Sequence, residues 1–212
     1  MKLLLSLKKL PFQLVYLLIG FISYAFIQSP ALGADISTRS VNLEVVKIVR
    51  FLEFCEWSED NHPAPVEAPL ECVIVGADPC NFKDRFSYVI ENSEYKLNKR
   101  NIKVTSVSAI EEGLKAAKSN PRIAIMILMQ SESEKWNSSL FPRRDGLMII
   151  GAGKEYLQRG LTLVTRPEKN GVKLSLNISR AEAHGITIQA EALYLNRLLS
   201  RENKQMSKIS KD

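Results

Sequence analysis

The first candidate for chemistry in this sequence is the stretch LMIIGAGKEYLQRG at residues 147–160. An apolar run leads into Gly151 and Gly153, which is how the phosphate loop of dinucleotide-binding enzymes begins. That fingerprint requires a third glycine where this chain has Tyr156, and a P-loop requires Ser or Thr where it has Glu155. We therefore expect a strand-to-helix turn in which glycine relieves backbone strain, and no nucleotide site.

The other side chains capable of catalysis or metal binding are scattered. His62 lies in a proline-rich loop and His184 near a helix end, and neither has a partner at metal-ligand spacing. A histidine in the last turn of a helix typically bonds to the exposed carbonyl groups there. The sequence has no Gly-x-Ser-x-Gly elbow, and Glu111 and Glu112 point to different sides of a helix. We therefore expect no catalytic residue, no metal and no cofactor.

The three cysteines, Cys55, Cys72 and Cys80, allow at most one internal disulfide. Cys55 and Cys72 lie in apolar runs, which are typical of buried, unreactive thiols. Cys72 opens a predicted strand and Cys80 lies past its far end, while a strand advances about 3.3 Å per residue. A disulfide requires Cα atoms within about 7 Å, so a Cys72–Cys80 bridge needs a chain that doubles back. The alternative is that the cysteines pack as small apolar side chains.

Hydrophobic periodicity predicts the elements that position these residues. An apolar stripe at helical spacing predicts a largely buried helix over residues 39–57, with Glu44 and Lys47 on its narrow polar face. A proline-rich loop follows, and Ser108 with Glu111 matches a capping box. The next elements are a buried strand and turn at 71–79, a helix at 81–91, an alternating strand at 101–108 and a helix at 108–120.

The second half of the chain continues the alternation of strands and helices. Residues 122–129 and 146–151 are continuous apolar runs, as in strands covered on both faces. Asn170 and Gly171 form a hairpin signal between two further strands. Helical pieces are predicted at 154–158, 179–185 and 187–201. The order predicts an α/β fold, a single layered domain over residues 36–200 with a mixed sheet flanked by helices.

Residues 1–34 have the features of a secretory signal peptide. A basic start with Lys2, Lys8 and Lys9 precedes an apolar run at 10–27, and small residues allow cleavage near Gly33 or Ala34. The alternative is an uncleaved anchor, because the run is near the lower length for a spanning helix. In both cases the domain is expected outside the cytoplasm.

The formal net charge of +6 comes from the ends of the chain. Residues 1–34 contain three lysines and no acid, and the segment after Tyr194 carries five basic residues against two acidic ones. The body between them is close to neutral. We therefore expect no nucleic-acid partner, which would need a basic patch on the domain, and we interpret residues 201–212 as a solvated basic tail.

Three stretches together resemble the YfiR-like family of exported regulatory proteins. They are RFLEFCEWSED at 50–60, CVIVGADPCNF at 72–82 and GVKLSLNISRAEAHGITIQAEALYLNRL at 171–198. Their order and spacing agree with the family from about residue 41 to residue 199. The stretch with Gly151 and Gly153 occupies the place between two strands where the family has a glycine-containing turn and a short helix.

The resemblance implies a periplasmic, non-enzymatic protein that binds and restrains a membrane-anchored diguanylate cyclase through its periplasmic domain. Release of the cyclase would raise cyclic di-GMP and favour biofilm formation. A homodimer is also implied. The family is associated with redox sensing through disulfides, and Cys72 matches its cysteine at the strand start. The usual partner of that cysteine would lie near residues 122–129, which contain none, and the later pair is missing. A Cys72–Cys80 bridge stays open.

Two other functions remain open at this point. One is an enzyme or small-ligand-binding protein with a cleft at the strand ends, where open α/β sheets bind ligands. Its rim would be formed by Gly76 and Asp78 in one turn and by Gly151 and Gly153 in the other. The other is an envelope or adhesion component held by an uncleaved helix at 10–27. A regulator is expected instead to expose an apolar patch, as interaction surfaces often do.

Overall fold

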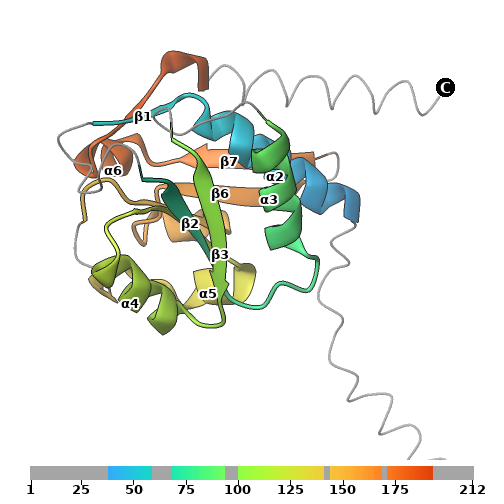
Figure 1. Cartoon of the computed structure of the whole chain (residues 1–212), viewed down its shortest axis with the longest axis horizontal. Helices are drawn as coiled ribbons and strands as arrows, with labels where there is room; N and C mark the ends of the chain where they lie inside the picture. Colours follow the sequence, from blue (N-terminus) through green and yellow to red (C-terminus); the bar gives the residue numbers. More distant parts are fainter. Residues whose placement is uncertain (1–37, 59–67, 94–99, 141–143, 169–170, 193–212) are drawn as a thin grey trace, which may run out of the picture. The chain divides into compact units, whose positions relative to one another are not determined.

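The computed structural model (Figure 1) describes residues 38–58, 68–93, 100–140, 144–168 and 171–192. All described residues belong to one compact unit. The predicted signal peptide at 1–34 and basic tail at 201–212 lie outside the described residues, so these boundaries stay predictions. Among the described helices, none combines the length and the apolar character that crossing a membrane requires.

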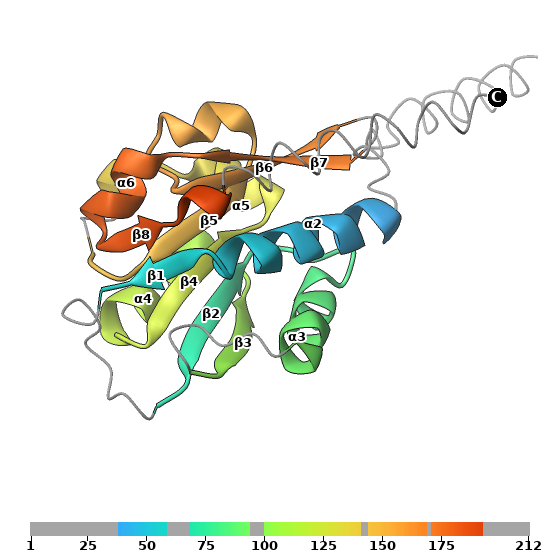
Figure 2. The ribbon, with the colours of Figure 1, turned by 90° about the horizontal axis from the view of Figure 1, so that it is seen from above.

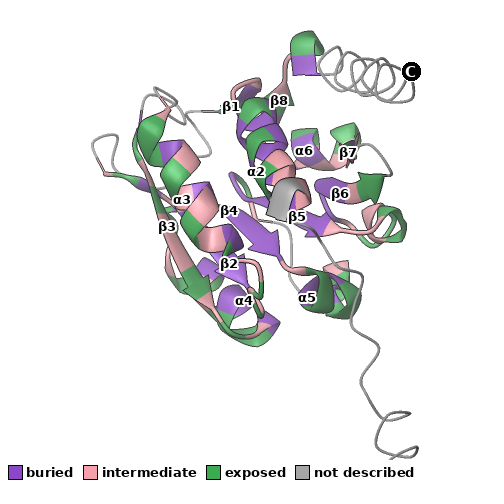
Figure 3. Cartoon of the chain, turned by 90° about the vertical axis from the view of Figure 1, so that its right-hand side faces the viewer, coloured by how far each residue is buried: buried purple, intermediate pink, exposed green. Residues whose placement is uncertain are grey.

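Six strands form a mixed sheet in the order β3-β2-β4-β5-β6-β7. Neighbouring strands are parallel except for β7, which is antiparallel to β6. The strands are β2 (Leu70–Val75), β3 (Ile102–Val107), β4 (Ile123–Leu128), β5 (Met148–Ala152), β6 (Leu163–Glu168) and β7 (Gly171–Leu176). Every residue of β4 is buried (Figure 3), as a continuous apolar run in a covered strand requires. The mixed sheet with its helices confirms the predicted α/β fold class.

Helices cover both faces of the sheet. α2 (Thr38–Leu52) and α3 (Phe82–Asn92) lie side by side on one face (Figure 2), whereas α4 (Ile110–Ser119) packs on the other. Side chains of a strand alternate between the two faces. Cys72 and Ile74 of β2 therefore join the apolar cluster of α2 and α3, and Val73 and Val75 join the cluster of α4.

The predicted helix at 39–57 is too long. α2 ends at Leu52, and Cys55–Trp57 form strand β1, which pairs antiparallel with β8 (Ile186–Ile188). β8 also replaces the start of the helix predicted at 187–201, whose residues from 193 onward lie outside the described part. The helical stripe did place Cys55 correctly in the core. The two short strands pair with each other although they are far apart in the sequence. A local hydrophobic pattern holds no information about such a pairing.

Smaller differences concern turns and caps. Glu168 pairs with Gly171, so Pro167 and Glu168 belong to β6 and only residues 169–170 separate the strands, as in the shortest hairpins. The backbone N–H and hydroxyl of Ser108 bond to Glu112, not to Glu111 as predicted. The short helices are α5 (Gln130–Lys135), α6 (Ile178–Ala183) and the 3₁₀ turns η3 (Ser138–Leu140) and η4 (Lys154–Leu157).

A partly buried polar network lies at the amino ends of the strands. The Arg144 guanidinium donates at 2.6–2.8 Å to the carbonyl oxygens of Ala117, Pro121 and Ile123. Burial lowers the pKa of Arg144. Nδ1 of His184 lies 2.7 Å from the carbonyl oxygen of Arg144, which lies outside the last turn of α6 where a carbonyl partner was expected. Trp57 Nε1 donates to the carbonyl oxygen of Gly146. The network joins α4, β1 and the end of α6 to the start of the parallel strands.

Candidate functional site

The carboxyl ends of β2 and β5 carry the two glycine turns that the sequence marked as the rim of a ligand site. β3 lies on one side of β2 and β4 on the other, so the chain reverses its direction of winding at β2. Open α/β sheets bind ligands in the crevice at such a switch point. Whether the chain can bind a ligand there depends on how closely other elements pack against these strand ends.

Helix α5 packs directly against both turns. Gly76 has a φ of 109°, and a Cβ added there would lie 2.6 Å from Cγ of Glu132. A Cβ on Gly151 would lie 2.8 Å from Oγ of Ser133, whose hydroxyl donates to Leu128 O and accepts from the N–H of Ala152. The two glycines are required because side chains of α5, and at Gly151 also the side chain of Leu161, approach the strand ends closely.

Glu132 occupies the place of an anion at the start of α4. Its Oε2 accepts from the backbone N–H of Ile110 at 2.9 Å, and its Oε1 accepts from Nζ of Lys135 at 2.8 Å. The residue is 4 % exposed. Helix amino termini attract anions through their free N–H groups, and here the protein supplies the anion itself. The sequence did not single out Glu132, because the stretch QSESEK has the composition of an exposed helix.

Asp78 has a structural role in the first turn. Its two carboxylate oxygens accept from the backbone N–H groups of Phe82 at 2.6 Å and Lys83 at 2.8 Å. Both groups belong to the first turn of α3, whose preceding residue Asn81 adopts the left-handed conformation. The GADPCNF stretch is therefore a strand-to-helix connection that Asp78 holds together, and this carboxylate is committed to helix capping.

The second turn is also closed by its own side chains. Gly153 has a φ of 100°, and a Cβ there would lie 2.7 Å from the ring of Tyr156. The N–H of Gly153 donates to the carbonyl oxygen of Thr165 at 3.0 Å, which fixes the turn to β6. Across the described segments, no group of His, Cys, Asp and Glu side chains has an arrangement suited to a metal ion. His62 lies outside these segments.

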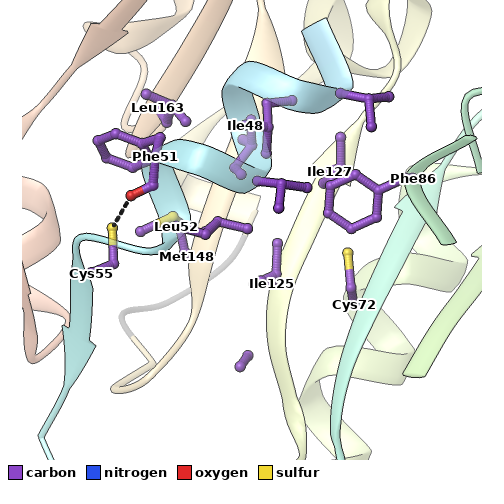
Figure 4. Close-up of a cluster of buried hydrophobic side chains, with 14 of the residues drawn as sticks. Ile48, Phe51, Leu52, Cys55, Cys72, Phe86, Ile125, Ile127, Met148 and Leu163 are labelled. Atoms are coloured by element: carbon purple, nitrogen blue, oxygen red, sulfur yellow. Dashed lines mark hydrogen bonds between the residues drawn. The ribbon is translucent and has the colours of Figure 1, made fainter. Parts of the chain in front are cut away.

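Cys55 and Cys72 are buried free thiols in the structure. Cys72 is fully buried in β2 with its sulfur pointing toward Phe86 of α3, and Cys55 lies elsewhere in the same cluster (Figure 4). Burial raises the pKa of both thiols well above the ordinary value, so neither is a reactive thiolate. Cys80 is half-buried against the same cluster. The Cys72–Cys80 disulfide stays a prediction.

Three large apolar side chains are exposed on the described part of the chain: Val46, Tyr88 and Ile178. Val46 and Tyr88 lie on α2 and α3, which pack against each other, and Tyr88 is 67 % exposed. Ile178 begins α6, after β7 at the other end of the sheet. Tyrosine is among the residues that contribute most to protein interfaces, so the α2–α3 face is the stronger candidate for an interaction surface.

Comparison with known proteins places this fold in a family. The chain matches the model of the YfiR/HmsC-like family over residues 42–197. That range contains all strands of the main sheet, both glycine turns and the α2–α3 face. A comparison with curated proteins finds no match. Because the family model covers most of the chain, the resemblance seen in the sequence is confirmed, and the chain belongs to the YfiR/HmsC-like family.

Proposed function

We propose that this protein is exported to the periplasm and there binds and restrains a membrane-anchored diguanylate cyclase. The observation that carries the proposal is the family match over residues 42–197, because the YfiR/HmsC-like family is known for periplasmic regulators of diguanylate cyclases. Export would rest on residues 1–34, as a cleaved signal peptide or an uncleaved anchor. Each form would place the domain beside the periplasmic part of such a cyclase.

The closed edge of the sheet supports a binding role without catalysis. An α/β enzyme would place its reacting groups at the switch point. Here Asp78 caps α3 and Glu132 caps α4, while Ser133 bonds to the backbone of β4 and β5. Each of these polar groups already has partners within the fold. A cleft at Gly76 and Gly151 would require α5 to move away.

Restraint requires that the protein bind two states of the cyclase with different affinities. A partner shifts an equilibrium only by its differential affinity for the two states. Changing a cyclase from about 99 % active to about 1 % active requires roughly 10⁴-fold tighter binding to the inactive state. We assign this binding to the α2–α3 face around Val46 and Tyr88. The homodimer implied by the family would add a second such face, and sedimentation of the purified protein measures whether it forms.

A pull-down tests the proposal. The protein with a C-terminal tag is exported in its own host, membranes are solubilised, and captured proteins are identified by mass spectrometry. We expect a diguanylate cyclase in wild-type captures, strongly reduced with Tyr88→Ala. Ile178→Ala is the matched control, because it removes an exposed apolar side chain from another part of the fold. Capture of no cyclase, together with thermal stabilisation of the pure protein by a small molecule, would instead support ligand binding at the strand ends.

A further inference from the structure

A hydrogen bond between side chains that are distant in sequence joins α2 to the β6–β7 hairpin. Oε1 of Glu44 accepts from the Thr165 hydroxyl at 2.5 Å. Thr165 is 2 % exposed, and Glu44 is partly buried. The same hydroxyl oxygen lies 3.5 Å from the carbonyl oxygen of Gly151, at the end of β5. The Thr165 hydroxyl thus stands between an acid on α2 and the backbone of the glycine turn.

One hydroxyl proton cannot serve both acceptors. A threonine hydroxyl has a single proton to donate, and an ionised carboxylate can only accept. While Glu44 is ionised, the Thr165 proton is held by the carboxylate and the Gly151 carbonyl does not receive it. Once Glu44 is protonated, its own O–H can donate to Thr165, which leaves the Thr165 proton available for Gly151. The direction of the chain of hydrogen bonds therefore depends on one proton at Glu44.

We propose that Glu44 and Thr165 form a proton-dependent hydrogen-bond switch that connects α2 to the carboxyl end of β5. Protonation of Glu44 turns the Thr165 hydroxyl from Glu44 toward the carbonyl oxygen of Gly151. The switch concerns the fold of the domain itself, so it holds or fails independently of the proposed regulation of a cyclase.

The surroundings of Glu44 favour its neutral form. Burial raises the pKa of the Glu44 carboxyl, and the bond from Thr165 lowers it by less. The charged groups on the elements packed around it are Lys47 and Arg50 on α2 with Glu53 just beyond its end, Lys83, Asp84, Arg85 and Glu91 on α3, Arg166 and Glu168 on β6 and Lys173 on β7. Within the described residues, none of them forms an ion pair with Glu44.

Two of these charged groups are already engaged. Arg166 pairs with Glu168 at 2.7 Å. Lys47, which is 4 % exposed, donates to the carbonyl oxygen of Val172 on β7. Burial lowers the pKa of Lys47 and the charge of Glu168 raises it by less. These two cations are thus directed away from Glu44, and the Thr165 hydroxyl donates to its carboxylate.

Carboxyl titration by NMR tests the switch directly. In ¹³C-labelled protein purified after export, we expect the Glu44 carboxyl, assigned by its loss in Glu44→Gln, to titrate with a midpoint above the ordinary glutamate value of about 4.3. The carbonyl resonance of Gly151 should follow with the same midpoint. In Thr165→Val, the Glu44 midpoint should rise further, because the bond that favours its ionised form is gone, and Gly151 should no longer follow.

Two NMR results would overturn the switch. One is a Glu44 midpoint at or below the ordinary value. The other is a Gly151 carbonyl that ignores the Glu44 titration in the wild type or follows it unchanged in Thr165→Val. Each result would mean that the Thr165 proton does not change its acceptor.

Thermal unfolding provides a second test with its own control. A carboxyl with a raised pKa in the folded state stabilises the fold below its unfolded pKa, and this contribution is lost as pH rises through the folded pKa. Glu44→Gln cannot ionise, so its melting temperature should exceed that of the wild type by about 2–4 °C at pH 7 and match it at pH 4. Glu53→Gln, one residue past the end of α2 and paired with exposed Arg50, should show no such gain. An equal difference at both pH values for Glu44→Gln would contradict the switch.

Discussion

One glutamate lies at the sheet edge that α5 covers, and another lies where α2 contacts β6, a contact we call the α2 seam. The two carboxylates have different hydrogen-bond donors. Glu132 accepts from a backbone N–H of α4 and from Lys135. Glu44 accepts from a single hydroxyl and has no ion pair among the described residues. Glu132 is buried and Glu44 partly buried, but only Glu132 accepts from a backbone N–H and from an ammonium group.

This difference in donors makes the contact of Glu132 a fixed one and the contact of Glu44 one that can change. A carboxylate bonded to a helix amino terminus and to an ammonium group joins parts of the fold whose positions are fixed. One that meets only a hydroxyl can exchange its proton and keep a hydrogen bond in each state. We therefore expect the switch-point edge under Glu132 to stay closed and rigid, and the α2 seam at Glu44 to respond to pH.

The largest expected effect is that of Glu132→Ala. Its removal leaves the N–H of Ile110 buried without an acceptor, and loss of a hydrogen bond to a charged group costs about 2–3 kcal/mol. Urea unfolding measures the loss. Glu132→Gln keeps an acceptor at that position and should lose less. Equal losses for the two variants would show that the N–H contact does not hold this edge.

Gly76→Ala should cost about 2 kcal/mol, because a residue with a side chain is strained at a φ of 109° and its Cβ would meet Glu132. The control is Ala77→Ser in the same turn, where the side chain is exposed. If Gly76→Ala unfolds at the same urea concentration as the wild type, α5 does not pack closely against this turn.

Thr165→Val should lower the free energy of unfolding by about 1–2 kcal/mol at pH 7, because the Glu44 carboxylate loses its donor. Thr187→Val is a matched change at an exposed position of β8 and should stay within about 0.5 kcal/mol of the wild type. Equal losses in the two variants would show that the seam at Glu44 depends on packing alone.

Lys135→Ala should give the smallest effect, although its ammonium contacts Glu132. The lysine side chain is exposed, so water and salt screen the pair. We expect a change in the unfolding midpoint near the limit of detection at low salt and none at 1 M salt. A large loss would mean that Lys135, and not the N–H of Ile110, fixes Glu132.

Much of the fold was predictable because strands and helices carry their own periodicity. The buried runs at 122–129 and 146–151 became β4 and β5, and the glycines fell at strand ends as predicted. The ribbon of β1 and β8 was missed because its pairing joins segments that are far apart in the chain. A local pattern predicts a helix there as readily as a strand.

The candidate site was predictable only in part. The sequence indicated the positions of Gly76, Asp78 and Gly151, but not that side chains of α5 contact both turns. Glu44 and Lys47 were predicted on a polar face, yet that face packs against β6 and β7. Burial of a polar face depends on which element lies opposite, and helical periodicity carries no information on that neighbour.

The central claim, regulation of a diguanylate cyclase, is tested most directly by cyclic di-GMP in living cells. The gene for this protein is deleted in its host, and the nucleotide is measured in the deletion strain and after return of the wild type or Tyr88→Ala. We expect cyclic di-GMP to rise on deletion. Return of the wild type should restore the original level, whereas Tyr88→Ala at equal protein level should not. Unchanged cyclic di-GMP in the deletion strain would contradict it.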